Sequence, residues 1–103
     1  MKQIFFALAG LVIALTPALA WDDVLPQSSE VYLTAEELAG LDCDQLWHAR
    51  NEIYARNNYK FLTARAKAEF GDAGTTRHPK LNAFEEKNIA LIQETEAAAY
   101  CSD

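Results

Sequence analysis

The hydrophobic and polar positions along the chain predict helices rather than strands. Three segments begin with a residue that can cap a helix, followed three residues later by Glu or Gln, and apolar residues recur at helical spacing after each. These capping boxes are Thr34 with Glu37, Asp42 with Gln45, and Asn82 with Glu85. They predict a short helix stopped by Gly40, a helix from Asp42 to about Asn57, and a helix from Ala83 to about Ala99.

A second short helix is predicted between the two long ones. Thr63 can cap it, and it should run through Phe70 and end at Gly71. Residues 71–80 contain two Gly, one Pro and paired Thr, which indicates a surface loop. Alanine, a strong helix former, is the commonest apolar residue after position 20. We therefore expect an all-α fold, a small single domain of two long antiparallel helices plus two short helices.

Residues Met1 to Ala20 resemble a secretory signal peptide. Lys2 supplies the charged start, Ile4–Leu15 the apolar run, and Ala18-Leu19-Ala20 a cleavage site of small residues. An uncleaved anchor is the alternative, but the apolar run is shorter than the ~20 residues that a spanning helix needs. We expect a periplasmic or secreted protein with no membrane span after signal removal, an extended N-terminal arm over 21–31 and a helical domain over 32–103.

The net charge bears on the possible partners, and the cysteines bear on how the fold is stabilised. Removal of Lys2 with the signal leaves 8 Lys+Arg against 15 Asp+Glu, a net charge of −7, which disfavours nucleic acid. The two cysteines, Cys43 and Cys101, should form a disulfide in an oxidising compartment. Since a regular helix would point Cys101 away from the first long helix, we expect the last helix to fray or bend after Ala99.

The two long helices each place polar residues within an apolar face. On the first, Arg50 and Asn57 lie among Leu46, Trp47, Ala49, Ile53 and Tyr54, while His48, Asn51, Glu52 and Ala55 point the other way. On the second, Glu85 and Asn88 lie among Phe84, Leu91, Ile92 and Ala99. This pattern predicts a buried Arg50–Glu85 pair completed by Asn88 or Tyr54, with an exposed Glu52–Arg56 pair.

The first long helix contains the run Ala49-Arg50-Asn51-Glu52-Ile53-Tyr54-Ala55-Arg56. This run resembles the core signature of the YARHG domain, a small exported bacterial domain of unestablished activity. Further matching positions are Tyr32–Leu38, Leu41–Leu46, Tyr59-Lys60-Phe61, Leu81-Asn82, Glu85, Asn88-Ile89 and Leu91-Ile92. The resemblance implies an extracellular setting but no reaction.

The chain departs from that signature at its end, where Asn57-Asn58 replaces His-Gly. Asn tolerates the left-handed conformation that Gly adopts after a helix, so Asn58 should preserve the turn. The lost His was the motif residue that could titrate near neutrality. The residues that remain as candidates for binding are Arg50, Asn51, Glu52, Tyr54, Arg56, Asn57, Tyr59, Asn82, Glu85 and Asn88.

No pattern indicates catalysis or a cofactor. His48 and His78 lack metal-ligand spacing and are expected at the surface. Tyr54, Tyr59 and Phe61 could line a glycan groove, but we expect them in the core. We predict an exported, non-enzymatic module that binds an envelope protein or a peptidoglycan-type glycan. The alternative is a small periplasmic hydrolase, or a hydrolase inhibitor, that uses Arg50, Glu85 and Tyr54, and solvent access to these groups distinguishes the two.

Overall fold

The computed structural model describes residues 21–102, so the predicted signal peptide lies outside the described residues. Within them lie a 3₁₀ helix, η1 (Pro26–Ser29), and four α-helices: α2 (Ala35–Ala39), α3 (Cys43–Arg56), α4 (Ala64–Phe70) and α5 (Ala83–Ala98). This part of the chain holds no β-strand, only an isolated bridge between Tyr59 and Thr76. The described fold is therefore helical, as the sequence predicts.

The helices begin and end where their local signals place them. All three predicted capping boxes are present, at Thr34, Asp42 and Asn82. Thr63 accepts a hydrogen bond from the Ala66 amide at the start of α4. Gly71 ends that helix with a positive φ of 86°, which suits a residue without a side chain. Local hydrogen bonding thus explains the helix boundaries.

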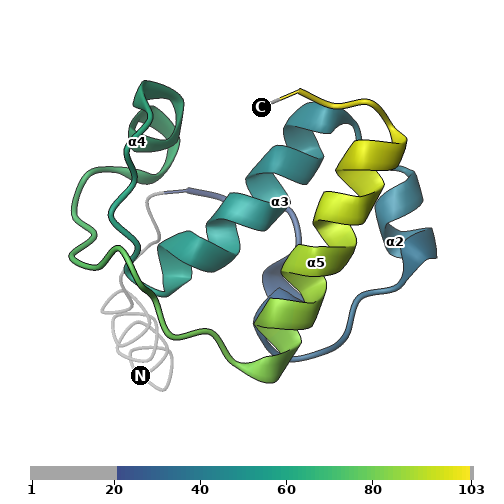
Figure 1. The fold of residues 1–103 in the computed structure, drawn as a ribbon, viewed down its shortest axis with the longest axis horizontal. Coiled ribbons are helices and arrows are strands. Elements are labelled where there is room, and N and C mark those ends of the chain that lie inside the picture. The colour runs from purple at the N-terminus through teal and green to yellow at the C-terminus, as the bar shows by residue number, and fades with distance from the viewer. Residues whose placement is uncertain (1–20, 103) are drawn as a thin grey trace, which may run out of the picture.

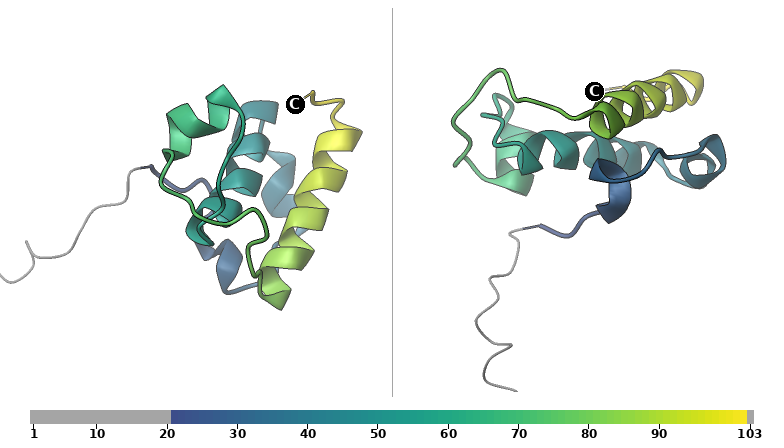
Figure 2. Two further views of the ribbon diagram at one scale, coloured as in Figure 1. Left: turned by 60° about the vertical axis from the view of Figure 1, so that its left-hand side comes forward. Right: turned by 90° about the horizontal axis from the view of Figure 1, so that it is seen from below.

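Helices α3 and α5 lie side by side, as Figure 1 shows, and form the centre of the fold. Their shared core also receives Leu25, Leu33 and Leu38 from the preceding segments. The buried residues of this main core are Leu25, Leu33, Leu38, Leu46, Ala49, Ile53, Ile89 and Ile92. Helices η1 and α2 pack against α5, while α4 packs against α3 at a separate place; the two views of Figure 2 show α4 standing apart from α5. Helix α3 is consequently covered on more than one side.

A second, aromatic cluster joins α4 to α3. Phe61, Ala66 and Phe70 are its buried residues. The Phe61 and Phe70 rings stack with centroids 5.2 Å apart, and Trp21 meets the edge of Phe70 at 5.4 Å. Such ring pairs add to the stabilisation from apolar burial. The cluster holds a helix of only seven residues, which could not be stable alone.

The predicted disulfide is confirmed. Cys43, in the first turn of α3, is bonded to Cys101, with the two Cα atoms 5.5 Å apart. The helix ends at Ala98, and Tyr100 adopts a left-handed conformation with φ of 57°. That reversal after the helix end lets Cys101 turn back toward α3. The expected bend after Ala99 is therefore present, and its residue is Tyr100.

The N-terminal arm differs from the prediction. Residues 21–31 are not loose or simply extended, because η1 forms within them and Ser28 is fully buried. Side chains of α3 and α5 hold this segment through hydrogen bonds to its backbone. Such contacts do not require a periodic pattern of side chains, so the sequence does not reveal them. The arm is a structural part of the domain.

Candidate functional site

The predicted Arg50–Glu85 pair is wrong, because each residue bonds to other partners. Arg50 donates to both carboxylate oxygens of Glu96, with distances of 2.7 Å from Nε and 3.1 Å from Nη2. Glu96 lies eleven residues beyond Glu85, a separation of about 16 Å along a helix. It shares the helix face of Glu85, because eleven residues make three turns. The spacing along α5 could therefore have identified Glu96 as the partner of Arg50.

Glu85 instead joins the arm to the end of α3. Its Oε2 atom accepts hydrogen bonds from the Ser29 hydroxyl at 2.7 Å and from the Asn57 side-chain amide at 2.9 Å. Its Oε1 atom accepts from the Asn82 backbone amide as part of the capping box. Burial alone would raise the pKa of Glu85, but these donors, together with the positive charge of Arg56, lower it below its ordinary value.

The expected exposure of Glu52 and Arg56 is also wrong. Glu52 is fully buried and accepts hydrogen bonds from the backbone amides of Val24 and Leu25, each at 2.8 Å. The face of α3 that looks polar in the sequence is covered by the arm, so its carboxylate caps arm backbone that water would otherwise solvate. Burial raises the pKa of Glu52, although the two amides and His48 act in the opposite direction.

Arg56 is the cation at the centre of this contact. Its guanidinium donates to both Ser28 and Ser29 hydroxyls, to the Leu25 carbonyl and to Glu52, and it forms an ion pair with Asp23 at 3.1 Å. Within residues 21–102 only its Nε atom lacks a hydrogen-bond partner among buried side-chain atoms. Arg56 therefore fastens the arm to α3 rather than making a local surface pair.

His48 extends these contacts to α4 and is not a free surface histidine. Its Nδ1 atom lies 2.8 Å from Glu52, and its Nε2 atom lies 2.8 Å from Glu69 of α4. A chain of polar contacts therefore runs from α5 to α4 through the arm. We call it the polar chain, and its members are Glu85, Ser29, Arg56, Glu52, His48 and Glu69.

Asn88 is a second fastening point between α5 and the arm. Its Oδ1 atom accepts a hydrogen bond from the Leu33 amide, while its side-chain nitrogen donates to the carbonyls of Ser28 and Val31. Asn82 also donates from its side chain to the Ser29 carbonyl. Four of the candidate binding residues, Glu52, Arg56, Asn82 and Asn88, thus bond to backbone groups of the arm or of the segment after it. The sequence alone did not reveal these contacts because the arm has no periodic pattern.

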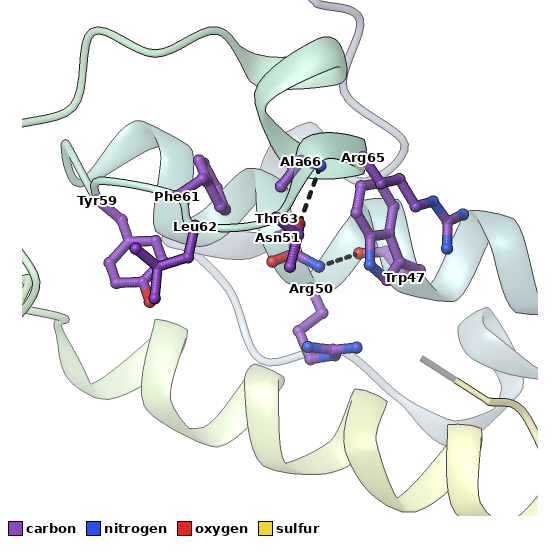
Figure 3. A pocket seen from close by; sticks show the side chains of 9 residues that line it. All are labelled: Trp47, Arg50, Asn51, Tyr59, Phe61, Leu62, Thr63, Arg65 and Ala66. Atoms are coloured by element: carbon purple, nitrogen blue, oxygen red, sulfur yellow. Dashed lines mark hydrogen bonds between the residues drawn. The ribbon is translucent and has the colours of Figure 1, made fainter.

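Three of the candidates, Arg50, Asn51 and Tyr59, line a groove between α3 and the segment that leads into α4. This groove has a volume of about 480 Å³. Figure 3 shows Tyr59 and Leu62 at one end, Trp47 and Arg65 at the other, and Asn51 between them. The residues that line it are Trp47, Arg50, Asn51, Tyr59, Phe61, Leu62, Thr63, Arg65 and Ala66. We call it the α3–α4 groove.

The α3–α4 groove contains exposed apolar surface beside fixed polar groups. Leu62 is 59% exposed, whereas its neighbour Phe61 is buried. The Arg65 guanidinium lies over the Trp47 ring, 3.8 Å from its centroid. Sequence reasoning selected Arg50, Asn51 and Tyr59 but missed Trp47, Leu62 and Arg65, since only the packing of α4 brings them together.

Tyr59 and Phe61 were considered as residues of either a groove or the core, and they contribute to both. Phe61 is core and Tyr59 is half-buried, yet both contribute to the lining of the groove. Tyr54 is half-buried, packs against both hydrophobic clusters and does not line the groove. Arg50, Glu85 and Tyr54 therefore do not converge on one site.

Neither a metal site nor a membrane span is evident in the part of the chain that the structure describes. Between residues 21 and 102, no three His, Cys, Asp or Glu side chains are grouped so that they could hold a metal ion. No helix in the same range is long and apolar enough to cross a membrane.

Comparison with known proteins identifies the family of the chain but assigns it no reaction or ligand. No curated protein and no solved structure matches the chain. The family model of the YARHG domain matches residues 22–97, which includes the arm together with all five helices up to the last turn of α5. The arm therefore lies within the family domain, although the sequence placed its beginning at residue 32. Because the match covers most of the chain, the protein belongs to the YARHG domain family.

Proposed function

We propose that this protein is an exported, non-enzymatic module of the cell envelope that binds an envelope component in the α3–α4 groove. The observation that carries the proposal is the contrast between two sets of polar residues. The polar chain is occupied with internal partners, whereas the exposed Leu62 and the half-buried Tyr59 and Asn51 line one concavity. Binding sites are concave and largely apolar, with a few fixed polar groups, and the groove fits that description.

Export is supported by the cysteines and by the N-terminal sequence. Both cysteines are consumed in the Cys43–Cys101 disulfide, a bond that persists in oxidising compartments outside the cytoplasm. The predicted signal peptide over residues 1–20 would deliver the chain there. The periplasm and the extracellular medium are equally compatible with these features.

Binding to intact peptidoglycan and to envelope proteins tests the proposal. The purified protein would be sedimented with sacculi and, in parallel, immobilised for capture from an envelope extract. Leu62→Ser removes exposed apolar surface from the groove without adding charge, so we expect bound protein to fall several-fold. Val31→Ser is the matched control, because Val31 is also exposed but belongs to the arm. Retention of binding by Leu62→Ser, or absence of binding to either preparation, would contradict the proposal.

A further inference from the structure

The basic residues of this acidic protein are concentrated near the α3–α4 groove. The chain has 15 acidic and 9 basic residues, yet the stretch from Ile53 to Ala68 contains four basic residues and no acidic one. Three of the four, Lys60, Arg65 and Lys67, are exposed on the segment that forms one wall of the groove or on α4. The resulting potential favours an anionic ligand at this wall and disfavours it over most of the remaining surface.

Arg65 is oriented to receive a carboxylate. Its guanidinium carbon lies over the Trp47 ring, 3.8 Å from the centroid, and the planar guanidinium carries N–H groups around its edge. One of them donates to Asp44 at 2.9 Å, but the side chains of this pair are 47% and 88% exposed. Exposed ion pairs contribute little free energy, so a ligand carboxylate can replace Asp44 at small cost. The planar guanidinium is also preorganised for bidentate binding of a carboxylate.

The centre and the far end of the groove suit a peptide. The Asn51 side-chain nitrogen donates to the Trp47 carbonyl at 2.9 Å, which fixes the amide orientation. Among residues 21–102 no donor reaches its Oδ1 atom, so this acceptor can receive a peptide N–H from a ligand. Beyond it, Leu62 and Tyr59 offer an apolar surface to a small side chain.

We propose that the α3–α4 groove binds a short carboxylate-bearing peptide with small side chains, of the kind that forms the peptide stems of the cell-wall polymer. The carboxylate is placed at Arg65, a peptide group at Asn51 and a methyl-sized side chain beside Leu62. Charge complementarity selects a carboxylate-rich peptide, and the volume of about 480 Å³ admits a few small residues rather than a folded partner. This inference rests on the proposed function, which supplies the envelope setting.

Fractions from one peptidoglycan digest test the inference. Amidase treatment separates soluble peptide stems from the sugar strands, and each fraction is titrated into the protein while amide NMR signals are recorded. We expect the peptide stems to shift signals around Asn51 and Arg65. Peptide stems whose carboxylates have been converted to amides should not produce these shifts. Binding of the sugar strands instead of the peptides, or equal binding of amidated peptides, would overturn the inference.

Arg65→Gln provides the decisive variant, with Arg77→Gln as its control. Both arginines are exposed, but Arg77 lies in the 71–80 loop and does not line the groove. We expect Arg65→Gln to weaken binding of the peptide stems at least tenfold, and Arg77→Gln to change it less than twofold, with unchanged circular dichroism for both. Unaltered affinity of Arg65→Gln would overturn the inference.

The failure of this inference can be distinguished from failure of the proposed function. If Leu62→Ser loses binding to sacculi while soluble peptide stems produce no shifts, the groove binds another envelope component and only the inference fails. If the wild-type protein binds neither sacculi nor envelope proteins, the proposed function fails as well.

Discussion

Arg50 and Arg56 lie six residues apart on α3, but the structure indicates that they contribute differently to the stability of the fold. Arg56 pairs with the fully buried Glu52 and binds four groups of the arm, whereas Arg50 pairs with Glu96, whose side chain is 11% exposed. Removing one partner of a buried pair leaves an uncompensated charge, which costs about 3 kcal/mol or more. The larger penalty therefore belongs to Arg56, although the sequence predicts a buried pair for Arg50 and an exposed pair for Arg56.

We expect Arg56→Ala to lower the free energy of unfolding by roughly 3 kcal/mol, and Arg50→Ala to lower it by less. Urea unfolding of both variants, followed by circular dichroism, measures the two values. Wild-type-like stability of Arg56→Ala would show that the arm contributes little to the fold.

The contributions of Glu52 and Glu85 to the free energy of unfolding should depend on pH in opposite directions. The folded-state pKa of Glu52 is raised above its ordinary value of 4.5 by burial, so the folded state binds the extra proton and the contribution of Glu52 is lost as pH rises from 4.5 through its folded pKa. Burial alone would raise the pKa of Glu85 too, but hydrogen bonds and Arg56 hold it below 4.5. Its contribution is therefore present above pH 4.5 and is lost as pH falls through its folded pKa.

The variants Glu52→Gln and Glu85→Gln separate these effects. We expect the stability difference between wild type and Glu52→Gln to shrink with rising pH above 4.5, and the difference between wild type and Glu85→Gln to shrink with falling pH below 4.5. Denaturant unfolding at intervals from about pH 3 to pH 7 measures both, since that range brackets ordinary Glu titration. Parallel pH profiles for the two variants would contradict the assigned directions.

At the scale of elements, the loop between α4 and α5 is fixed by backbone contacts with the end of α3. Asn58 takes the predicted left-handed conformation, with φ of 66°, and its carbonyl accepts hydrogen bonds from the amides of Thr75 and Thr76. The Lys60 amide donates to the Thr76 carbonyl at 2.7 Å. Gly74 lies directly against Tyr59, where a Cβ atom would overlap the Tyr59 carbonyl group. These contacts position Tyr59 at the groove.

We expect Gly74→Ala to destabilise the fold by about 2 kcal/mol, because backbone must move to make room for the methyl group. Gly40→Ala is the control, since a Cβ atom at Gly40 meets nothing within 4 Å and its φ is negative. Thermal unfolding of the two variants compares them. Equal melting temperatures would mean that the loop can shift freely.

At the scale of the whole molecule, one covalent bond and the arm hold together a domain with a small core. The disulfide joins residues separated by 58 positions along the chain and spans the ends of both long helices. Closing a loop of that length stabilises a fold by about 4 kcal/mol in the chain-entropy model. Within residues 21–102 the two clusters together hold eleven buried apolar residues, a small core that leaves little reserve without the disulfide.

We expect replacement of both cysteines by serine to lower the free energy of unfolding by about 4 kcal/mol. Unfolding in urea, compared with the oxidised wild type, measures the change. A double variant as stable as the oxidised protein would mean that packing of α3 against α5 is sufficient.

Features that depend on near neighbours along the chain can be predicted from the order of the residues. Each capping box places donor and acceptor three residues apart, so the helix starts at Ala35, Cys43 and Ala83 follow from local hydrogen bonding. Asn58 and Gly71 likewise reveal their conformations through residue type. The disulfide followed from composition and compartment, because two cysteines allow one intramolecular pairing.

Which polar residues are buried, and which line a site, depends on packing between segments that are far apart in the sequence. Glu52 belongs to the polar side of α3 when that helix is considered alone, and the aperiodic arm turns that side into an interior by presenting two backbone amides. Helical periodicity reports how residues divide between faces but not how many faces are covered. The groove likewise depends on packing, because contacts between α3 and α4 bring Trp47 close to Leu62 and Arg65. The spacing of these three residues in the sequence has no common period.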